Sequence, residues 1–102
     1  MPSPEATASE TNEVRIVKKT AHHLGEPIGE TETHYDAQDR VVFERATDFT
    51  TGAVNTTDYV FQGGMREEIW KDKEGRMIRY VINENGERVL AERDPNFEDV
   101  DF

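Results

Sequence analysis

Turn-forming clusters recur at almost even spacing along this chain of 102 residues and divide it into short segments. Strong turn formers that separate short β-prone runs are typical of an antiparallel meander. No segment keeps apolar residues at helical spacing for three turns without meeting such a cluster, so we expect strands rather than helices. The clusters are Asp36-Ala37-Gln38-Asp39-Arg40, Thr50-Thr51-Gly52, Gln62-Gly63-Gly64, Asp72-Lys73-Glu74-Gly75-Arg76 and Asn83-Glu84-Asn85-Gly86-Glu87.

The segments between these turns concentrate Val, Ile, Thr, Tyr, Phe and Trp, which fit a pleated, half-buried surface. Gly25 and Pro27 predict a loop over 21–29. The fold class is therefore all-β, as a single antiparallel meander of six or seven strands. We predict strands at 14–20, 30–36, 41–48, 56–62, 65–72, 76–82 and 88–92.

The sheet is expected to have a thin core, because hydrophobic residues make up 34% of the chain and charged residues 33%. In 76–82 both faces of the predicted strand carry apolar side chains. In 65–72, Met65, Glu67 and Ile69 are expected on one face of the strand and Arg66, Glu68 and Trp70 on the other. Few residues remain for a second layer. We therefore expect the sheet to curl strongly on itself or to pair with a second copy in a dimer.

The chain is predicted to hold one domain, at residues 13–93, between two flexible tails. Residues 1–12 combine Pro, Ser, Thr, Ala and Glu with no large apolar residue after Met1, so we expect a disordered N-terminal tail. Residues 94–102 form an acidic C-terminal tail, which Pro95 keeps out of the sheet. There is no signal-peptide pattern, membrane-spanning run or cysteine, and we predict a cytoplasmic protein without disulfides.

No motif for catalysis stands out, so we predict that the chain is not an enzyme. The two serines lie in the N-terminal tail, and Glu67 and Glu68 are adjacent on a strand and point to opposite faces. No metal site and no cofactor are predicted, because the histidines lack metal-binding spacing. Those histidines are His22, His23 and His34, near Glu26, Glu30 and Glu32.

Residues 35–41, Tyr-Asp-Ala-Gln-Asp-Arg-Val, resemble the opening of a YD-repeat (RHS-repeat), in which Tyr-Asp is followed by two variable residues, Gly, Arg and an aliphatic residue. Residues 47–61 look like the rest of such a repeat, and 71–77 resemble a second opening with Lys71 in place of Tyr. The resemblance covers about residues 33–90. Asp39 replaces the Gly, and the third turn has an extra residue, Glu87. The resemblance implies hairpin architecture and an interaction role, and it carries over no active residue.

The formal net charge of −10 disfavours nucleic acid and anionic membranes as partners, and it favours encounter with a basic protein surface. We therefore predict a non-catalytic acidic protein-binding module, a small inhibitor or immunity-type protein that covers a basic, nucleic-acid-binding site on a toxin, nuclease or other protein. The alternative is a structural or assembly β-module, related to YD-repeat hairpins, that self-associates. Charge that serves solubility alone is the competing explanation.

The candidate partner-binding residues are acids of the predicted strands, which mimic nucleic-acid phosphates, Trp70 as an aromatic anchor, and the acids and phenylalanines of the C-terminal tail. Two alternatives remain open: Trp70 is buried in the core, and Phe97 or Phe102 packs back on the sheet. The full set is Glu44, Asp48, Asp58, Trp70, Asp94, Phe97, Glu98, Asp99, Asp101 and Phe102.

Overall fold

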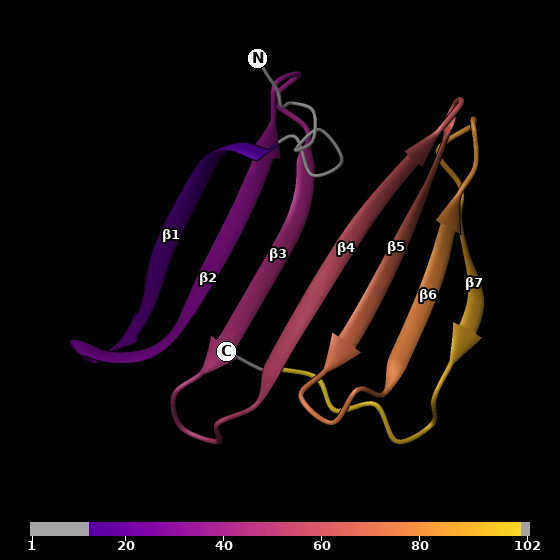
Figure 1. The fold of residues 1–102 in the computed structure, drawn as a ribbon. Coiled ribbons are helices and arrows are strands. Elements are labelled where there is room, and N and C mark those ends of the chain that lie inside the picture. The colour runs from indigo at the N-terminus through magenta and orange to yellow at the C-terminus, as the bar shows by residue number, and fades with distance from the viewer. Residues whose placement is uncertain (1–12, 101–102) are drawn as a thin grey trace, which may run out of the picture.

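The computed structural model describes residues 13–100, which form one seven-stranded antiparallel sheet followed by a short C-terminal segment (Figure 1). Each strand pairs with its neighbours in sequence, so the predicted meander is confirmed. No helix that could span a membrane occurs among these residues. The strands are β1 (Glu13–His23), β2 (Glu26–Asp36), β3 (Val41–Asp48), β4 (Val54–Gln62), β5 (Met65–Asp72), β6 (Met77–Ile82) and β7 (Arg88–Arg93).

The predicted loop over 21–29 is wrong, because β1 and β2 extend into it and meet at a two-residue turn. Leu24 and Gly25 have φ of 52° and 83°, the signs that a type I′ hairpin requires. Pro27 lies opposite His22 next to an irregularity in the β1–β2 pairing, and β3 pairs with β2 only from Gly29 onward. A strand tolerates proline at such an edge or irregular position.

Three turns share one hydrogen-bond pattern, and each begins with a short acidic or amide residue: Asp36, Asp72 or Asn83. The Oδ1 atom of this first residue accepts the N–H groups of the residues two and four positions later. Its own C=O accepts the N–H of the fourth residue of the turn. That fourth residue has a positive φ in all three turns, at Asp39, Gly75 and Gly86. The sequence clusters therefore specify the turns through side-chain caps and a left-handed residue.

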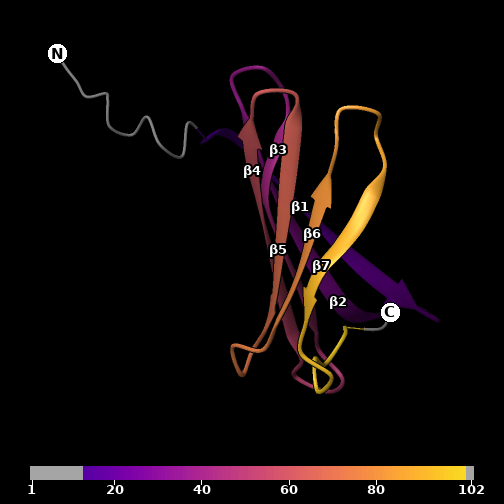
Figure 2. The same ribbon diagram turned by 90° about the vertical axis from the view of Figure 1, so that its right-hand side faces the viewer.

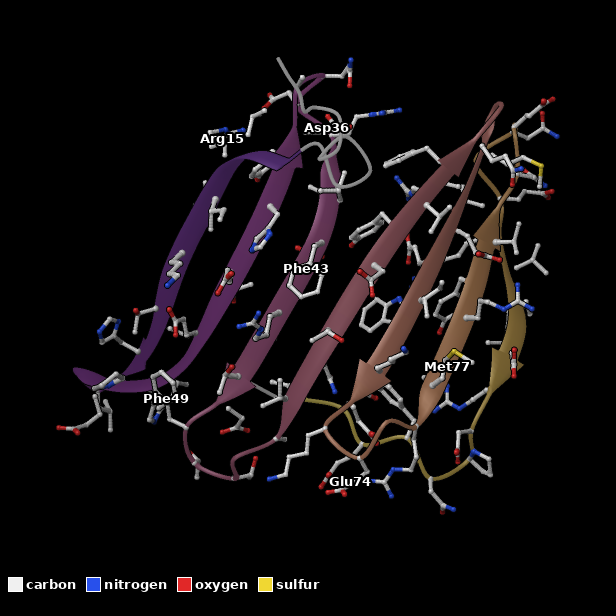
Figure 3. The ribbon with its side chains drawn as sticks, in the orientation of Figure 1. Arg15, Asp36, Phe43, Phe49, Glu74 and Met77 are labelled. Carbon is white, nitrogen blue, oxygen red and sulfur yellow. The ribbon has the colours of Figure 1, made fainter. Side chains whose placement is uncertain are left out.

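The sheet has two faces, which β5 illustrates. One face carries Arg66, Glu68, Trp70 and Asp72, and we call it the tail face because residues 94–100 lie against it. The other, which carries Met65, Glu67, Ile69 and Lys71, we call the open face. Phe43 and Met77 belong to the open face and lie on the viewer's side of the sheet in Figure 3. The division of 65–72 between two faces agrees with the sequence pattern.

The sheet is open, since β1 and β7 lie at opposite edges. The closure expected from strong curling is not found, because the accumulated twist of the strands does not bring the edges together. The twist instead bends β7 and one end of β1 toward the side on which the C-terminal segment lies (Figure 2). The radius of gyration is 15.5 Å, against about 13 Å for a globular chain of 100 residues.

Little apolar surface is buried in this single layer. Among the described residues, the buried apolar side chains are Ala53, Ile78 and Phe97. Burial falls mainly on polar groups that are fixed by hydrogen bonds, such as Asn55, Glu68 and Asp72. Large apolar side chains remain 45% exposed or more at Val14, Ile16, Leu24, Phe49, Val60, Met65, Val89 and Leu90.

Candidate functional site: the tail face of strands β4 to β7

Aromatic and arginine side chains gather on the tail face where β4, β5, β6 and β7 lie side by side. The strand register places these side chains in three rows that run across the four strands. The rows are Phe61, Arg66, Ile82 and Arg88; Tyr59, Glu68, Tyr80 and Leu90; and Thr57, Trp70, Ile78 and Arg93.

Glu68 lies at the centre of the rows and is 6% exposed. Its Oε2 atom accepts a hydrogen bond from Arg66 Nη2 at 3.1 Å. Its Oε1 atom accepts from Arg88 Nη2 at 3.2 Å and from the indole N–H of Trp70 at 3.3 Å. A buried carboxylate is tolerated when it is paired and hydrogen-bonded in this way. Glu68 therefore holds two arginines and the tryptophan in fixed positions.

The aromatic rings of this site are held by stacking as well. The Trp70 and Tyr80 rings meet edge to face, with centroids 6.4 Å apart and planes at 76°. The guanidinium carbon of Arg88 lies 3.8 Å from the centroid of the Tyr80 ring, and that of Arg66 lies 5.7 Å from the Tyr59 ring. These contacts limit the freedom of the long side chains, and side chains that are already held in place lose less entropy when they enter an interface.

Tyr59 connects the site to β3. Its hydroxyl donates to Glu44 Oε1 at 2.6 Å. Burial, and then the hydrogen bond to Glu44, raises the pKa of Tyr59 well above its usual value. The phenol is therefore a protonated donor at neutral pH, and it orients the Glu44 carboxylate on the tail face.

The C-terminal segment covers the neighbouring part of the tail face, and it passes behind β4 in Figure 1. The N–H of Glu98 donates to Asp72 Oδ2 at 3.0 Å. The amide of Asn55 donates to the Glu98 carbonyl at 2.8 Å and accepts the N–H of Val100 at 2.7 Å. Phe97 is 9% exposed. Of the two alternatives for the tail, the structure thus shows the one in which Phe97 packs back on the sheet.

The predicted partner-binding residues are only partly brought together. Trp70 is half-buried within the site, and Glu44 lies on the same face beside Tyr59. Asp48 is buried and accepts the N–H groups of Thr50 and Thr51 in its own turn. Asp58 is exposed on the open face, where it pairs in register with Phe43. The strand acids therefore do not form one surface.

The predicted residues of the C-terminal tail lie at one end of the sheet. Asp94 caps a turn by accepting the N–H of Asn96 at 2.9 Å. Glu98 and Asp99 are exposed, and Glu98 Oε1 lies 3.7 Å from Arg76 Nη2. Asp101 and Phe102 lie outside the described residues, as does the predicted tail at 1–12.

Arg66, Glu68, Tyr80 and Arg88 are among the site residues that the sequence prediction did not include. Strand alternation places Arg66 and Glu68 beside Trp70, and this signal was present in the sequence. The position of Arg88 over Tyr80 depends on the register of β7 against β6, which contains an irregularity between Arg79 and Tyr80. A shift of one residue would turn Arg88 to the other face, so the sequence alone could not place it.

Acidic residues on the tail face are nearly balanced by basic ones, so the excess negative charge lies in the turns and the terminal segments. The acids at strand positions of this face are Glu44, Asp48, Glu68 and Asp72, and the bases are Arg15, Lys19, Arg66, Arg88 and Arg93. Exposed acids at the ends of the sheet are Glu26, Asp39, Glu74, Glu84, Glu87, Glu98 and Asp99. Of these, Glu74, Glu84, Glu87, Glu98 and Asp99 border strands β4 to β7, so the site has a nearly neutral centre and an acidic rim.

Within residues 13–100, no three His, Asp or Glu side chains are placed to hold a metal ion. His34 lies on the open face, with Nε2 at 2.6 Å from Glu32 Oε2 and its ring 4.9 Å from that of Phe43. The hydrogen bond with His34 lowers the pKa of Glu32, and Arg45 contributes in the same direction.

Comparisons of the chain with protein-family models, with curated proteins and with solved structures give no match.

Proposed function

We propose that the chain is a small non-catalytic protein-binding module that contacts its partner with the tail face of β4 to β7. The observation that supports this most is the set of rows around Glu68, in which Trp70, Tyr80, Arg66 and Arg88 are already held in place. Trp, Tyr and Arg dominate the energetic centres of protein interfaces.

The charge distribution suggests the chemistry of that partner. A nearly neutral aromatic centre fits an apolar patch, and the acidic rim fits a border of Lys and Arg. A net charge of −10 speeds encounter with such a surface. An inhibitor or immunity-type role in the cytoplasm, toward a basic nucleic-acid-binding protein such as a toxin or nuclease, is consistent with these features. In this proposal the acids steer and border the contact.

The second candidate is an assembly module related to YD-repeat hairpins. It is favoured by the shared hydrogen-bond pattern of the turns at Asp36 and Asp72, each closed by an arginine four residues later. Pairing through the sheet edges is disfavoured, however. The β1 edge carries Lys18 and Lys19, and β7 is short, charged and irregular. Such features protect edges from pairing, so assembly through a face is the favoured form.

The test compares binding partners captured from an extract of the source cells by the wild-type chain and by Trp70→Ala and Arg88→Ala variants. The controls are Phe49→Ala, an exposed aromatic in the β3–β4 turn, and Arg45→Ala, an arginine near the Phe43 ring on the open face. We expect one protein to be retained by the wild type and both controls and lost with both tail-face variants. Its association rate should fall between about 50 and 200 mM salt.

Two results would contradict the proposal. One is that every captured protein is retained equally by Trp70→Ala and Phe49→Ala. The other is that the rate of association with the captured protein changes neither with salt nor in the double variant Glu98→Gln with Asp99→Asn. That result would mean that the acidic rim does not steer the partner, and it would favour the assembly candidate.

A further inference from the structure

We propose that the open face binds a second copy of this chain, so that two sheets stack face to face in a two-layer β-sandwich. This inference concerns the face opposite to the proposed partner site and does not depend on it. A dimer of this kind would leave both tail faces free to bind partners.

The open face carries an apolar patch across β4 to β7. Val60 and Val81 flank Glu67 in one cross-strand row, which ends at Val89. Val60 and Met65 are each 45% exposed and Val89 is 53% exposed. A shallow hollow of about 220 Å³ lies among Val60, Met65 and Val81. Exposed apolar side chains that adjoin one another mark an interaction surface more reliably than scattered ones.

The part of the chain that the structure describes does not cover this patch. The C-terminal segment lies on the opposite face, where Asn55 accepts the N–H of Val100. Residues 1–12 contain no large apolar side chain after Met1. Within residues 13–100 the patch stays exposed and accessible to another chain.

The charges of the open face favour an identical face as that cover. Arg79 Nη1 donates to Glu67 Oε2 at 2.7 Å, and Arg79 Nε donates to Glu92 Oε1 at 3.4 Å. Arg45 Nη1 lies 3.6 Å from Glu32 Oε1 at the other end of the face. The acids at strand positions of this face, Glu30, Glu32, Asp58, Glu67 and Glu92, are thus nearly matched by the bases Lys18, Arg45, Lys71 and Arg79. Two such faces can meet with little net repulsion although each chain carries −10 overall. A strongly basic partner would find no matching excess of acid here.

The size of the face also matches what a dimer needs. Seven strands at about 4.8 Å spacing, with about eight residues each at about 3.3 Å, span about 34 by 26 Å, or roughly 900 Å². A stable interface buries about 800 Å² on each partner. Most of the open face, rather than the apolar patch alone, would then be covered by the second sheet at about 10 Å distance.

The first experiment measures mass by sedimentation velocity over about a hundredfold range of concentration, because a dimer is concentration-dependent. We expect the wild type to approach twice the chain mass of 11.7 kDa. The double variant Val60→Lys with Val89→Lys should weaken dimerisation at least about a hundredfold, since it places lysines in an apolar contact. The matched control is Leu90→Lys, which changes an equally exposed neighbour of Val89 on the tail face and should leave the dimer intact.

A second measurement does not rely on disrupting the dimer. The chain has no cysteine, so Thr56→Cys on the open face and Lys19→Cys on the tail face can each be spin-labelled singly. We expect a short, well-defined distance between the labels of two Thr56→Cys copies, because both lie at the contact. The distance between the labels of two Lys19→Cys copies should be longer, because both sheets lie between them. A monomer throughout the concentration range, or a dimer broken by Leu90→Lys and kept by the valine variant, would overturn the proposal.

Discussion

The Oδ2 atom of Asp72 accepts the Nε–H of Arg76 at 2.6 Å and the N–H of Glu98 at 3.0 Å, so one carboxylate fixes both the β5–β6 turn and the C-terminal segment. Asp36 makes the equivalent contact with Arg40 at 2.8 Å. Asp36, however, lies at the opposite end of the sheet from the C-terminal segment (Figure 3). The two turns therefore offer a controlled comparison.

We predict that Asp72→Asn lowers the thermal unfolding midpoint more than Asp36→Asn does. An asparagine at position 72 can still accept the backbone N–H groups of the turn through Oδ1, as Asn83 does in its own turn. Its Nδ2 group, however, cannot accept the hydrogen bonds from Arg76 and Glu98, so these two donors would lose their partner. The midpoint can be followed by circular dichroism, with exposed Glu74→Gln as the control that should change little. Equal effects of the two Asn variants would argue against a dual role of Asp72.

Stability should fall as the pH drops below about 4.5. Burial alone would raise the pKa of Asp72, but the N–H groups of Glu98, Arg76 and Glu74 and the Arg76 side chain outweigh it, so that its pKa lies below its usual value. The same balance lowers the pKa of Asp36. A carboxylate whose pKa is lower in the folded chain stabilises it above the unfolded pKa, and this stabilisation is lost as pH falls toward the folded pKa.

Urea unfolding at neutral pH, near pH 5 and near pH 3 measures this dependence. We expect little change between the first two conditions and a clear loss at the third, with a smaller loss in Asp72→Asn because that variant has no carboxylate to protonate there. Stability that remained constant down to pH 3 would contradict the interpretation.

Asn55→Ala should detach the C-terminal segment while the sheet remains folded. The variant removes the donor to the Glu98 carbonyl and the acceptor for the Val100 N–H. The free energy that holds the segment on the sheet should fall by about 1–3 kcal/mol. Hydrogen exchange at the amides of Glu98 and Val100 should accelerate. Asn96→Ala, whose side chain is exposed, is the control and should leave both amides protected.

Ile78→Ala should be among the most damaging apolar truncations in the sheet, with a loss of about 2–5 kcal/mol, because Ile78 is 4% exposed. Leu90→Ala on the adjacent strand should cost less than about 1 kcal/mol, since Leu90 is 50% exposed. Chemical denaturation of both variants measures the difference. Similar losses would mean that Leu90 is buried in solution, for example by an interface on the tail face.

Exchanging the left-handed residues of two turns should have opposite effects. Gly75→Asp forces an L-residue to a φ of 86° and should destabilise the chain by about 1 kcal/mol. Asp39→Gly relieves the same strain at a φ of 65° and should stabilise by up to about 1 kcal/mol, since the exposed Arg15–Asp39 ion pair adds little. Ala37→Gly, in the same turn without a positive φ, is the control and should destabilise.

The turns and the strand faces could be predicted from the sequence because their signals are local. Asp36, Asp72 and Asn83 fix their own turns through contacts within five residues. The β1–β2 hairpin was missed because Pro27 and Gly25 indicate a break, and only the position of Pro27 beyond the end of β3 makes it acceptable in a strand.

The candidate site could not be predicted in the same way. The Glu68–Arg88 contact joins β5 to β7 across β6, and the Asn55 contacts span more than forty residues of sequence. Both depend on strand register and on irregularities that leave no local signal. The composition indicates the net charge of the chain but not where the carboxylates lie. Many of them cap turns, as Asp36, Asp48 and Asp72 do, and so do not form one binding surface.

The order of the strands has a consequence for how the chain folds. Each strand pairs with the strands next to it in sequence, so contact order within the sheet is low and ordering can begin at any hairpin and spread outward, as in repeat proteins. The bond from Val100 to Asn55 closes a much longer loop and requires β4 to be in place first. We therefore expect the sheet to form rapidly and the C-terminal segment to join it last. A meander of this kind can also gain or lose a hairpin at either edge without rearranging the strands that remain.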